Sequence, residues 1–185
     1  MRKIFTALAV FLAVSSTCFA ANPVNVCDFN ADVFCKIYNR IVNLVVPKEA
    51  STIDESRITE HLLQNRKMIF IPLNSFDGAR GNFIEIVTDE KDFISRISIV
   101  SRMKSTKSKD TTSDPAEEFA VAFAATLITV GLDKTEIDAI IGDFKSMDLN
   151  GSADKFCTSI NRYVKIESNA MESSRTVSIE ITAHD

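Results

Sequence analysis

The segment DPAEEFAVAFAATLITVG, residues 114–131, decides the fold. Asp114 can cap a helix, and Glu117 can cap in return. Pro115 suits the first helical position, because an N–H there would have no hydrogen-bond acceptor within the helix. The helix that follows is apolar around most of its circumference and ends at Gly131. Such a helix is normally buried on two sides. Its alanines allow a close approach to a sheet, so we expect it to be the central helix of the core.

Segments on both sides of this helix have the composition of strands. Isoleucine, valine and phenylalanine dominate them, and several alternate in part between apolar and polar residues. The segments are KMIFIPL (67–73), NFIEIVT (82–88), FISRISIVSRM (93–103), RYVKIES (162–168) and RTVSIEITA (175–183). Asp77, Gly78 and Gly81 lie between the first two and suit a hairpin connection. The sequence therefore predicts an antiparallel sheet of about five strands.

Two further helices complete the prediction. Apolar residues recur at the three-and-four spacing of an amphipathic helix over residues 31–45, where Asn30 or Asp28 can cap the start and Pro47 stops the helix. A shorter helix over residues 133–144 opens with the capping sequence DKTE and presents isoleucines and a phenylalanine on one face.

The remaining segments are polar. Over residues 48–66 we expect a loop with a short helix near 58–63, and over residues 145–158 irregular structure or a short helical turn. The order is then helix, three strands, two helices, two strands. This order predicts a single α+β domain over residues 21–185, with the sheet packed on the central apolar helix.

Residues 1–20, MRKIFTALAVFLAVSSTCFA, have the order of a secretory signal peptide. Arg2 and Lys3 precede an apolar run, small and polar residues follow, and cleavage is expected after Ala20. The apolar run is shorter than the roughly 20 residues that a membrane span takes, and so is the apolar part of the 114–131 helix. We therefore expect an exported chain, periplasmic or secreted, with no membrane span after cleavage.

The exported chain is expected to be acidic. The sequence has 21 basic and 25 acidic side chains, and removal of Arg2 and Lys3 with the signal peptide leaves 19 basic residues and a net charge of −6. Scattered basic residues in an acidic chain are a poor match for nucleic acid. The basic cluster RMKSTKSK, residues 102–109, lies in a stretch rich in serine and threonine and is expected to be a solvated loop. We therefore predict no nucleic-acid partner.

Four cysteines are encoded, and Cys18 would leave with the signal peptide. Cys27, Cys35 and Cys157 would be left, which in an oxidising compartment allows one disulfide and one thiol. A bridge between Cys27 and Cys35 would close a short loop across a helix entry, whereas a bridge from Cys157 to either of them would join the two ends of the domain. The Cys27–Cys35 pair needs the fewest assumptions, because near neighbours in the sequence meet most readily.

The stretch ADVFCKIYNR, residues 31–40, returns as ADKFCTSINR, residues 153–162, with six of ten positions identical. A repeated structural unit would keep a regular period, and the chain that follows the two stretches does not. We interpret them as two helix entries that use similar residues, with aspartate near the first turn and phenylalanine and cysteine facing the core. A diverged duplication is the alternative.

The side chains of a catalytic or metal site do not occur in a recognisable arrangement. His61 and His184 have no second histidine at metal-ligand spacing. DLNGSAD, residues 148–154, resembles the start of a calcium loop but lacks the glycine at position six and the acid at position twelve, where Ser159 stands. The glycines form no phosphate-binding loop. We therefore predict no catalytic residue, cofactor site or metal site, and a protein that is not an enzyme.

Export, a sizeable core and the missing catalytic arrangement favour a binding protein. We expect it to bind another exported or envelope protein, as chaperone-like, inhibitor or immunity proteins of the bacterial periplasm do, through an open sheet edge or an exposed sheet face. The strands over residues 82–88 and 175–183 are the candidate surface. One alternative is a small-molecule or lipid carrier with an apolar pocket between sheet and central helix. Another is a hydrolase with an unrecognised site.

Overall fold

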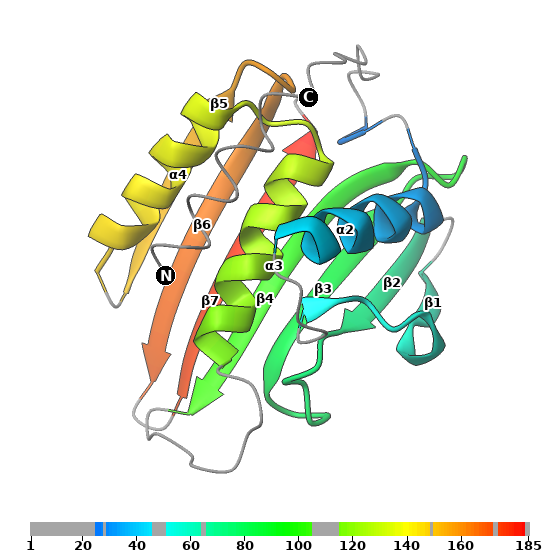
Figure 1. Ribbon diagram of the computed structural model, residues 1–185, viewed down its shortest axis with the longest axis horizontal. Helices are drawn as coiled ribbons and strands as arrows, with labels where there is room; N and C mark the ends of the chain where they lie inside the picture. The colour runs from blue at the N-terminus through cyan, green and yellow to red at the C-terminus, as the bar shows by residue number, and fades with distance from the viewer. Residues whose placement is uncertain are drawn as a thin grey trace.

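The computed structural model describes residues 25–27, 29–45, 51–63, 66–104, 115–148, 150–171 and 174–183. These residues form an α+β fold with one antiparallel sheet of seven strands and helices along one side of it (Figure 1). The helices are α2 (Ala31–Val45), α3 (Pro115–Thr129) and α4 (Lys134–Ser146), with a short 3₁₀ helix η2 (Glu55–Arg57). The strands are β1 (Thr59–Leu63), β2 (Arg66–Pro72), β3 (Gly81–Thr88), β4 (Ile94–Lys104), β5 (Gly151–Cys157), β6 (Arg162–Met171) and β7 (Ser174–Ala183).

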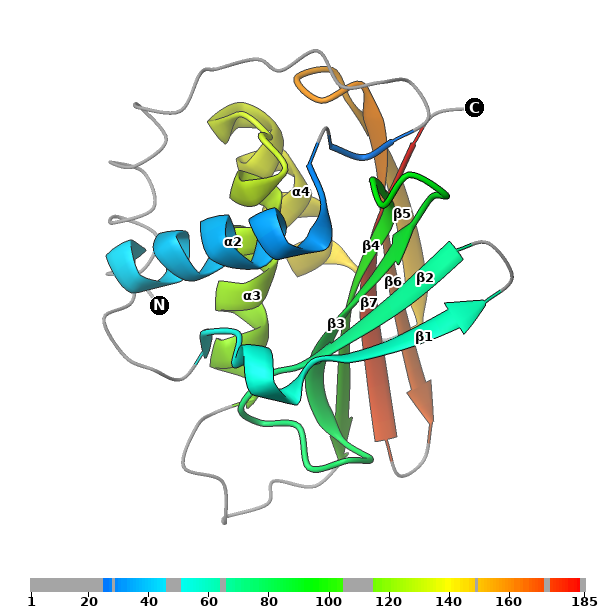
Figure 2. The same cartoon turned by 90° about the vertical axis from the view of Figure 1, so that its right-hand side faces the viewer.

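The sheet is built from two meanders that meet at its centre. Its strand order is β1-β2-β3-β4-β7-β6-β5, and every neighbouring pair is antiparallel. The helices α2, α3 and α4 lie on one face, which we call the inner face, and the opposite, outer face carries no helix among the described residues (Figure 2). The connection from β4 through α3 and α4 to β5 covers the inner face, so one meander is joined to the other across the core.

Alternation along the strands places the core on the inner face. Ile97 and Ile99 of β4 lie beside Ile181 and Ile179 of β7, and all four are fully buried. The helix α3 packs between α2 and the strands β3 and β4, and each of its residues from 121 to 129 is buried. The expectation that this segment forms the central core helix is confirmed. Its small residues permit the close approach to both layers.

The helix starts also follow the sequence signals. In α2 the Asn30 side chain accepts a hydrogen bond from the Val33 N–H at 3.1 Å, and in α4 Asp133 accepts one from the Glu136 N–H at 2.8 Å. The alternative cap Asp28, the stop at Pro47 and the cap Asp114 lie outside the described residues. The segment expected to be a signal peptide, residues 1–20, lies outside them as well. None of the described helices has the length and apolar character that crossing a membrane takes.

Two strands were not predicted, so the sheet has seven strands rather than about five. Strand β1 forms where a short helix was expected, and β5 forms where irregular structure was expected. Both are the outermost strands of the sheet. An outermost strand is covered less than a central one, so polar residues such as those of TEHLL and GSADKFC can form it without the apolar alternation that marks a strand in sequence.

The repeated stretch is not a repeated structure. Residues 31–40 are helical in α2, whereas residues 153–162 run through β5 and a turn into β6. The interpretation as two helix entries is therefore right for the first copy and wrong for the second. Asn39 lies within α2, but its counterpart Asn161 has a φ of 53°, in the left-handed region. The tertiary environment of each copy therefore determines its secondary structure, although six residues are shared.

A buried arginine in the second copy holds the start of the described chain. Arg162 is fully buried, and its Nε and Nη2 donate hydrogen bonds to the backbone oxygen of Asn25, the former at 2.6 Å. Its Nη1 donates to the Asn161 oxygen. One residue along, the Val26 N–H bonds to the Ile94 oxygen at 2.6 Å. Residues 25–27 are therefore fastened to the starts of β4 and β6.

A buried carboxylate joins the loop between β2 and β3 to the central helix. Glu118 of α3 is only 2% exposed, and it accepts hydrogen bonds from the Ser75 N–H at 3.1 Å and from the Asn82 side chain at 2.8 Å. The Ser75 hydroxyl donates to the same carboxylate and accepts from the Asn82 N–H at 3.0 Å. This network sets the position of the hairpin between β2 and β3.

Candidate functional site

The three cysteines predicted as disulfide partners are all buried. No disulfide joins any two of Cys27, Cys35 and Cys157 in the structure, so the preferred Cys27–Cys35 pair is not formed. Burial, reinforced by the neighbouring Glu55 carboxylate, raises the pKa of the Cys35 thiol to about 12. Burial likewise raises the pKa of the Cys157 thiol to about 12. A thiol with such a pKa stays protonated at neutral pH and is a poor nucleophile.

The histidines are not brought together with other metal-binding side chains. His61 lies exposed on β1, and His184 is outside the described residues. Across the described parts of the chain, no group of three or more histidine, cysteine, aspartate or glutamate side chains is arranged to hold a metal ion.

The strands expected to offer an open edge lie inside the sheet. Strand β3, with the sequence 82–88, pairs with β2 and β4, and β7, with the sequence 175–183, pairs with β4 and β6. Their backbone groups are therefore taken up by neighbours on both sides, and the edge prediction was wrong for these two strands. The edges of the sheet are β1 and β5, on opposite sides of the molecule (Figure 1).

The β5 edge is shielded by charge and by a helix. α4 packs beside β5, and Lys155 of β5 reaches Asp143 of α4 at 3.5 Å. The neighbouring Asp154 is exposed on the other side of the strand. Charged side chains on an edge strand and a covering helix are two of the usual protections against pairing with another chain.

The β1 edge has fewer of these protections: apart from Glu60 it carries no Asp, Lys or Arg side chain, and none of the described helices packs along it. Thr59, Glu60, His61 and Leu62 are all exposed, and Leu62, at 77%, is the most exposed large apolar residue among the described side chains. The sequence of β1 contains no proline or lysine, and its pairing with β2 has no bulge. Beyond the ladder to β2, no described backbone group bonds to residues 59–63. One side of this strand is therefore open to a further strand.

The register divides the β1 side chains between the two faces. Glu60 pairs with Ile69 and Leu62 with Lys67, and Ile69 belongs to the buried core. Because directly opposed residues of an antiparallel pair share a face, Glu60 and Leu62 lie on the inner face. The residues at odd positions lie on the outer face, where His61 is opposite Met68.

The approach to β1 is held in place at several points. The Asn39 side chain of α2 accepts from the Ile53 N–H at 2.6 Å and donates to the Ile53 oxygen at 3.0 Å. Asp54 caps η2 through the Ser56 N–H, and hydrogen bonds from Ser56 lower the pKa of the Asp54 carboxyl. Arg57 donates to the Phe76 oxygen at 3.2 Å. These contacts present β1 as a preformed edge.

Aromatic side chains stiffen the outer face next to β1. The rings of Phe70, Phe76 and Phe83 lie within 4.8 to 5.6 Å of one another, centroid to centroid. The Arg102 guanidinium lies over the Phe83 ring at 5.1 Å, a cation–π contact. Phe70 is the β2 residue opposite Thr59. The ladder that supports β1 is therefore packed on both faces near its start.

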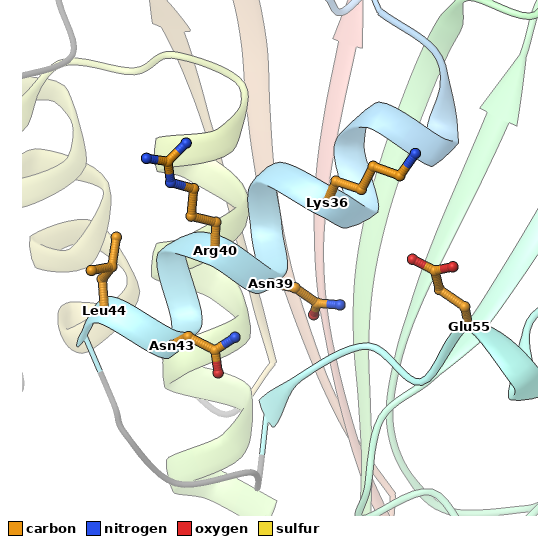
Figure 3. A pocket seen from close by; sticks show the side chains of 6 residues that line it. All are labelled: Lys36, Asn39, Arg40, Asn43, Leu44 and Glu55. Carbon is orange, nitrogen blue, oxygen red and sulfur yellow. The ribbon is translucent and has the colours of Figure 1, made fainter.

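A separate cavity of about 550 Å³ lies along the exposed side of α2 (Figure 3). Its lining comprises Lys36, Asn39, Arg40, Asn43, Leu44 and Glu55. Figure 3 shows Glu55 reaching from η2 toward the side of α2 that carries Lys36 and Asn39. Both amide atoms of Asn39 are already bonded to Ile53. This cavity lies outside the helix layer, not between the sheet and α3, where the carrier hypothesis expects a pocket.

Comparison of the chain with family models, with curated proteins and with solved structures finds no match. Sequence reasoning missed β1 because TEHLL has no clear period. One signal was present: Gln64 and Asn65 separate this segment from the apolar strand that begins at Arg66, and asparagine favours a tight hairpin turn.

Proposed function

We propose that this protein is an exported, non-catalytic binding protein that takes up an extended segment of another exported protein as an additional strand beside β1. The observation that carries the proposal is the open β1 edge, with Leu62 77% exposed. Strand addition supplies partners for backbone groups that otherwise bond only to water, and side-chain neighbours on each face supply selectivity.

The asymmetry of the two edges supports this choice. An edge strand is a hazard for aggregation, and β5 carries the charges and the helix that guard against it. Apart from Glu60, β1 carries no such charge, and no described helix packs along it. The segment that leads into β1 is held to α2 through Ile53. A preformed edge of this kind suits a strand-accepting site, because binding then costs little ordering of the receptor.

The energies of strand addition at β1 suit a weak, reversible complex. Net stabilisation by a backbone hydrogen bond is about 1 kcal/mol, and full burial of a leucine side chain contributes about 2 kcal/mol. A five-residue strand therefore supplies a few kcal/mol, before any contribution from the outer face. Chaperone-like, inhibitor and immunity proteins are the classes that suit such binding in the periplasm.

The test compares two leucine substitutions. The processed chain, tagged and recovered with its partners from the envelope or culture fluid of its source, is compared with Leu62→Lys and with Leu44→Lys. Leu44 is 53% exposed on α2 and serves as the matched control. We expect Leu62→Lys to weaken capture of a stoichiometric partner by more than about tenfold and Leu44→Lys to leave it unchanged.

Hydrogen exchange then locates the contact. Binding should slow the exchange of amides in residues 59–63 and leave those of β5 unchanged. Partner capture that is insensitive to Leu62→Lys, or protection confined to another element, would refute the proposal. The carrier alternative has less support, because the interface between α3 and the sheet is filled by buried side chains. Native mass spectrometry of the processed chain would revive it by detecting a retained small molecule.

A further inference from the structure

The inner-face side chains of β1 define what the added strand should carry. We propose that the segment bound at β1 runs antiparallel to it and contains an apolar residue followed, two positions later, by a lysine or arginine. This inference rests on the proposed function and adds the chemistry of the partner. It names the partner as an extended segment of a protein with apolar–any–basic order.

Leu62 and Glu60 are successive residues on the inner face of the edge. Leu62 is 77% exposed and is available for an apolar neighbour. Glu60 is exposed, and it has no hydrogen bond or ion pair among the described residues. Lys67, the residue opposite Leu62, also attracts the Glu60 carboxylate, but its ion pair is with Asp92 at 2.8 Å. The carboxylate of Glu60 is therefore available to a cation from the partner.

The order of the two partner residues follows from strand geometry. In an antiparallel pair, a residue opposite Leu62 precedes by two positions the residue opposite Glu60, because the strands run in opposite directions and side chains on one face recur every second residue. All neighbouring pairs in this sheet are antiparallel, and antiparallel pairing is slightly more stable per residue. A parallel strand would need the reverse order.

The residue between them has a different environment. It lies on the outer face beside His61, which is exposed. We therefore place the selectivity in the two inner-face positions, where Leu62 and Glu60 are exposed.

Net charge adds to the same preference. The whole sequence carries −4, and the exported chain, without Arg2 and Lys3, carries −6. An acidic protein attracts a basic segment at long range, although this effect is weak at physiological salt. The local carboxylate at Glu60 determines where the basic residue is placed.

The experiment measures peptide affinity for the processed chain by fluorescence anisotropy. The probes are nine-residue threonine peptides, blocked at both ends and labelled, with central sequence isoleucine–threonine–lysine, isoleucine–threonine–glutamate or lysine–threonine–isoleucine, or with threonine throughout. We expect the first to bind about tenfold more tightly than the second, because an opposite-charge pair replaces a like-charge pair. The reversed and all-threonine peptides should fall below the first as well.

Charge reversal on the protein provides the matched variants. Glu60→Lys should invert the order of the lysine and glutamate peptides. Asp154→Lys makes the same change in net charge on the opposite edge strand, where Asp154 is exposed, and should leave the order unchanged. Circular dichroism and melting temperatures establish that both variants are folded. If Glu60→Lys does not fold, the ranking of the four peptides by affinity for the unmodified chain still tests the apolar–any–basic inference.

The failures of the two proposals are distinguishable. Equal binding of all peptides with protection of residues 59–63 would overturn the apolar–any–basic inference and leave strand addition standing. If no peptide binds and the Leu62→Lys substitution does not weaken partner capture, strand addition itself is overturned. Sedimentation of the chain alone as a dimer that dissociates in Leu62→Lys would also overturn the inference, since β1 of a second copy would then be the occupant.

Discussion

At the scale of the residue, Gly81 is a position where only glycine fits. Its φ is 92°, and a Cβ placed on it would overlap the backbone carbonyl of Ser75. Ser75 in turn contacts the buried Glu118 carboxylate. The sequence predicted a hairpin turn at this glycine. The structure adds that a larger residue would overlap the Ser75 backbone, because the loop folds back onto the start of β3.

We expect Gly81→Ala to lower the free energy of unfolding by more than about 3 kcal/mol, because backbone strain and overlap with the Ser75 carbonyl add together. Gly78 is the matched control: its φ is 98°, but nothing lies within 4 Å of the place that an alanine methyl group would take. Gly78→Ala should therefore cost only the backbone strain, about 1 kcal/mol. Urea unfolding of both variants measures the difference, and equal losses would contradict the close-contact explanation.

The candidate site could not be read from its residues alone. Glu60 and Leu62 belong to a polar stretch with no clear period, and neither residue type indicates binding by itself. What distinguishes them is the position of β1 at the end of the strand order, where β2 is its only described strand neighbour. Strand order depends on contacts between segments far apart in the chain, which local sequence patterns do not encode.

Among the helices and strands, those with local sequence signals were predicted, and those that depend on long-range pairing were not. The starts of α2 and α4 carry capping side chains, and α3 is apolar around its circumference, so all three helices were expected close to their observed bounds. The five strands with apolar residues were expected too. The outermost strands β1 and β5 were missed, because half-exposed edges do not need the apolar pattern.

The small residues of α3 provide a test of its central position. Ala122 of α3 is fully buried, whereas Ala120 on the same helix is exposed. We expect Ala122→Leu to destabilise the fold by about 2 kcal/mol through overpacking, and Ala120→Leu to change stability by less than about 0.5 kcal/mol. Thermal and urea unfolding measure both. An equal effect of the two substitutions would show that α3 is not confined from two sides.

At the scale of the whole molecule, the two meanders and the first described residues meet at one end of the sheet. Asn25 and Arg162 are separated by 137 positions in the sequence, and the Arg162 side chain joins them. Val26 and Cys27 are buried beside this contact. Cleavage after Ala20, as the signal peptide predicts, would leave all of these residues on the exported chain. Residues 25–27, which we call the strap, therefore connect the start of the described chain to β4 and β6.

We expect removal of residues 21–28 from a chain that begins at Ala21 to lower the free energy of unfolding by about 4 kcal/mol, from the lost burial of Val26 and Cys27 and the lost hydrogen bonds of the strap. Arg162→Met in the chain of residues 21–185 should lower the free energy of unfolding by about 2 kcal/mol. Because both changes remove the same contact, combining them should cost less than their sum. Urea unfolding of the two single variants and the double variant completes this cycle. Strict additivity would mean that Arg162 and the strap stabilise the fold independently.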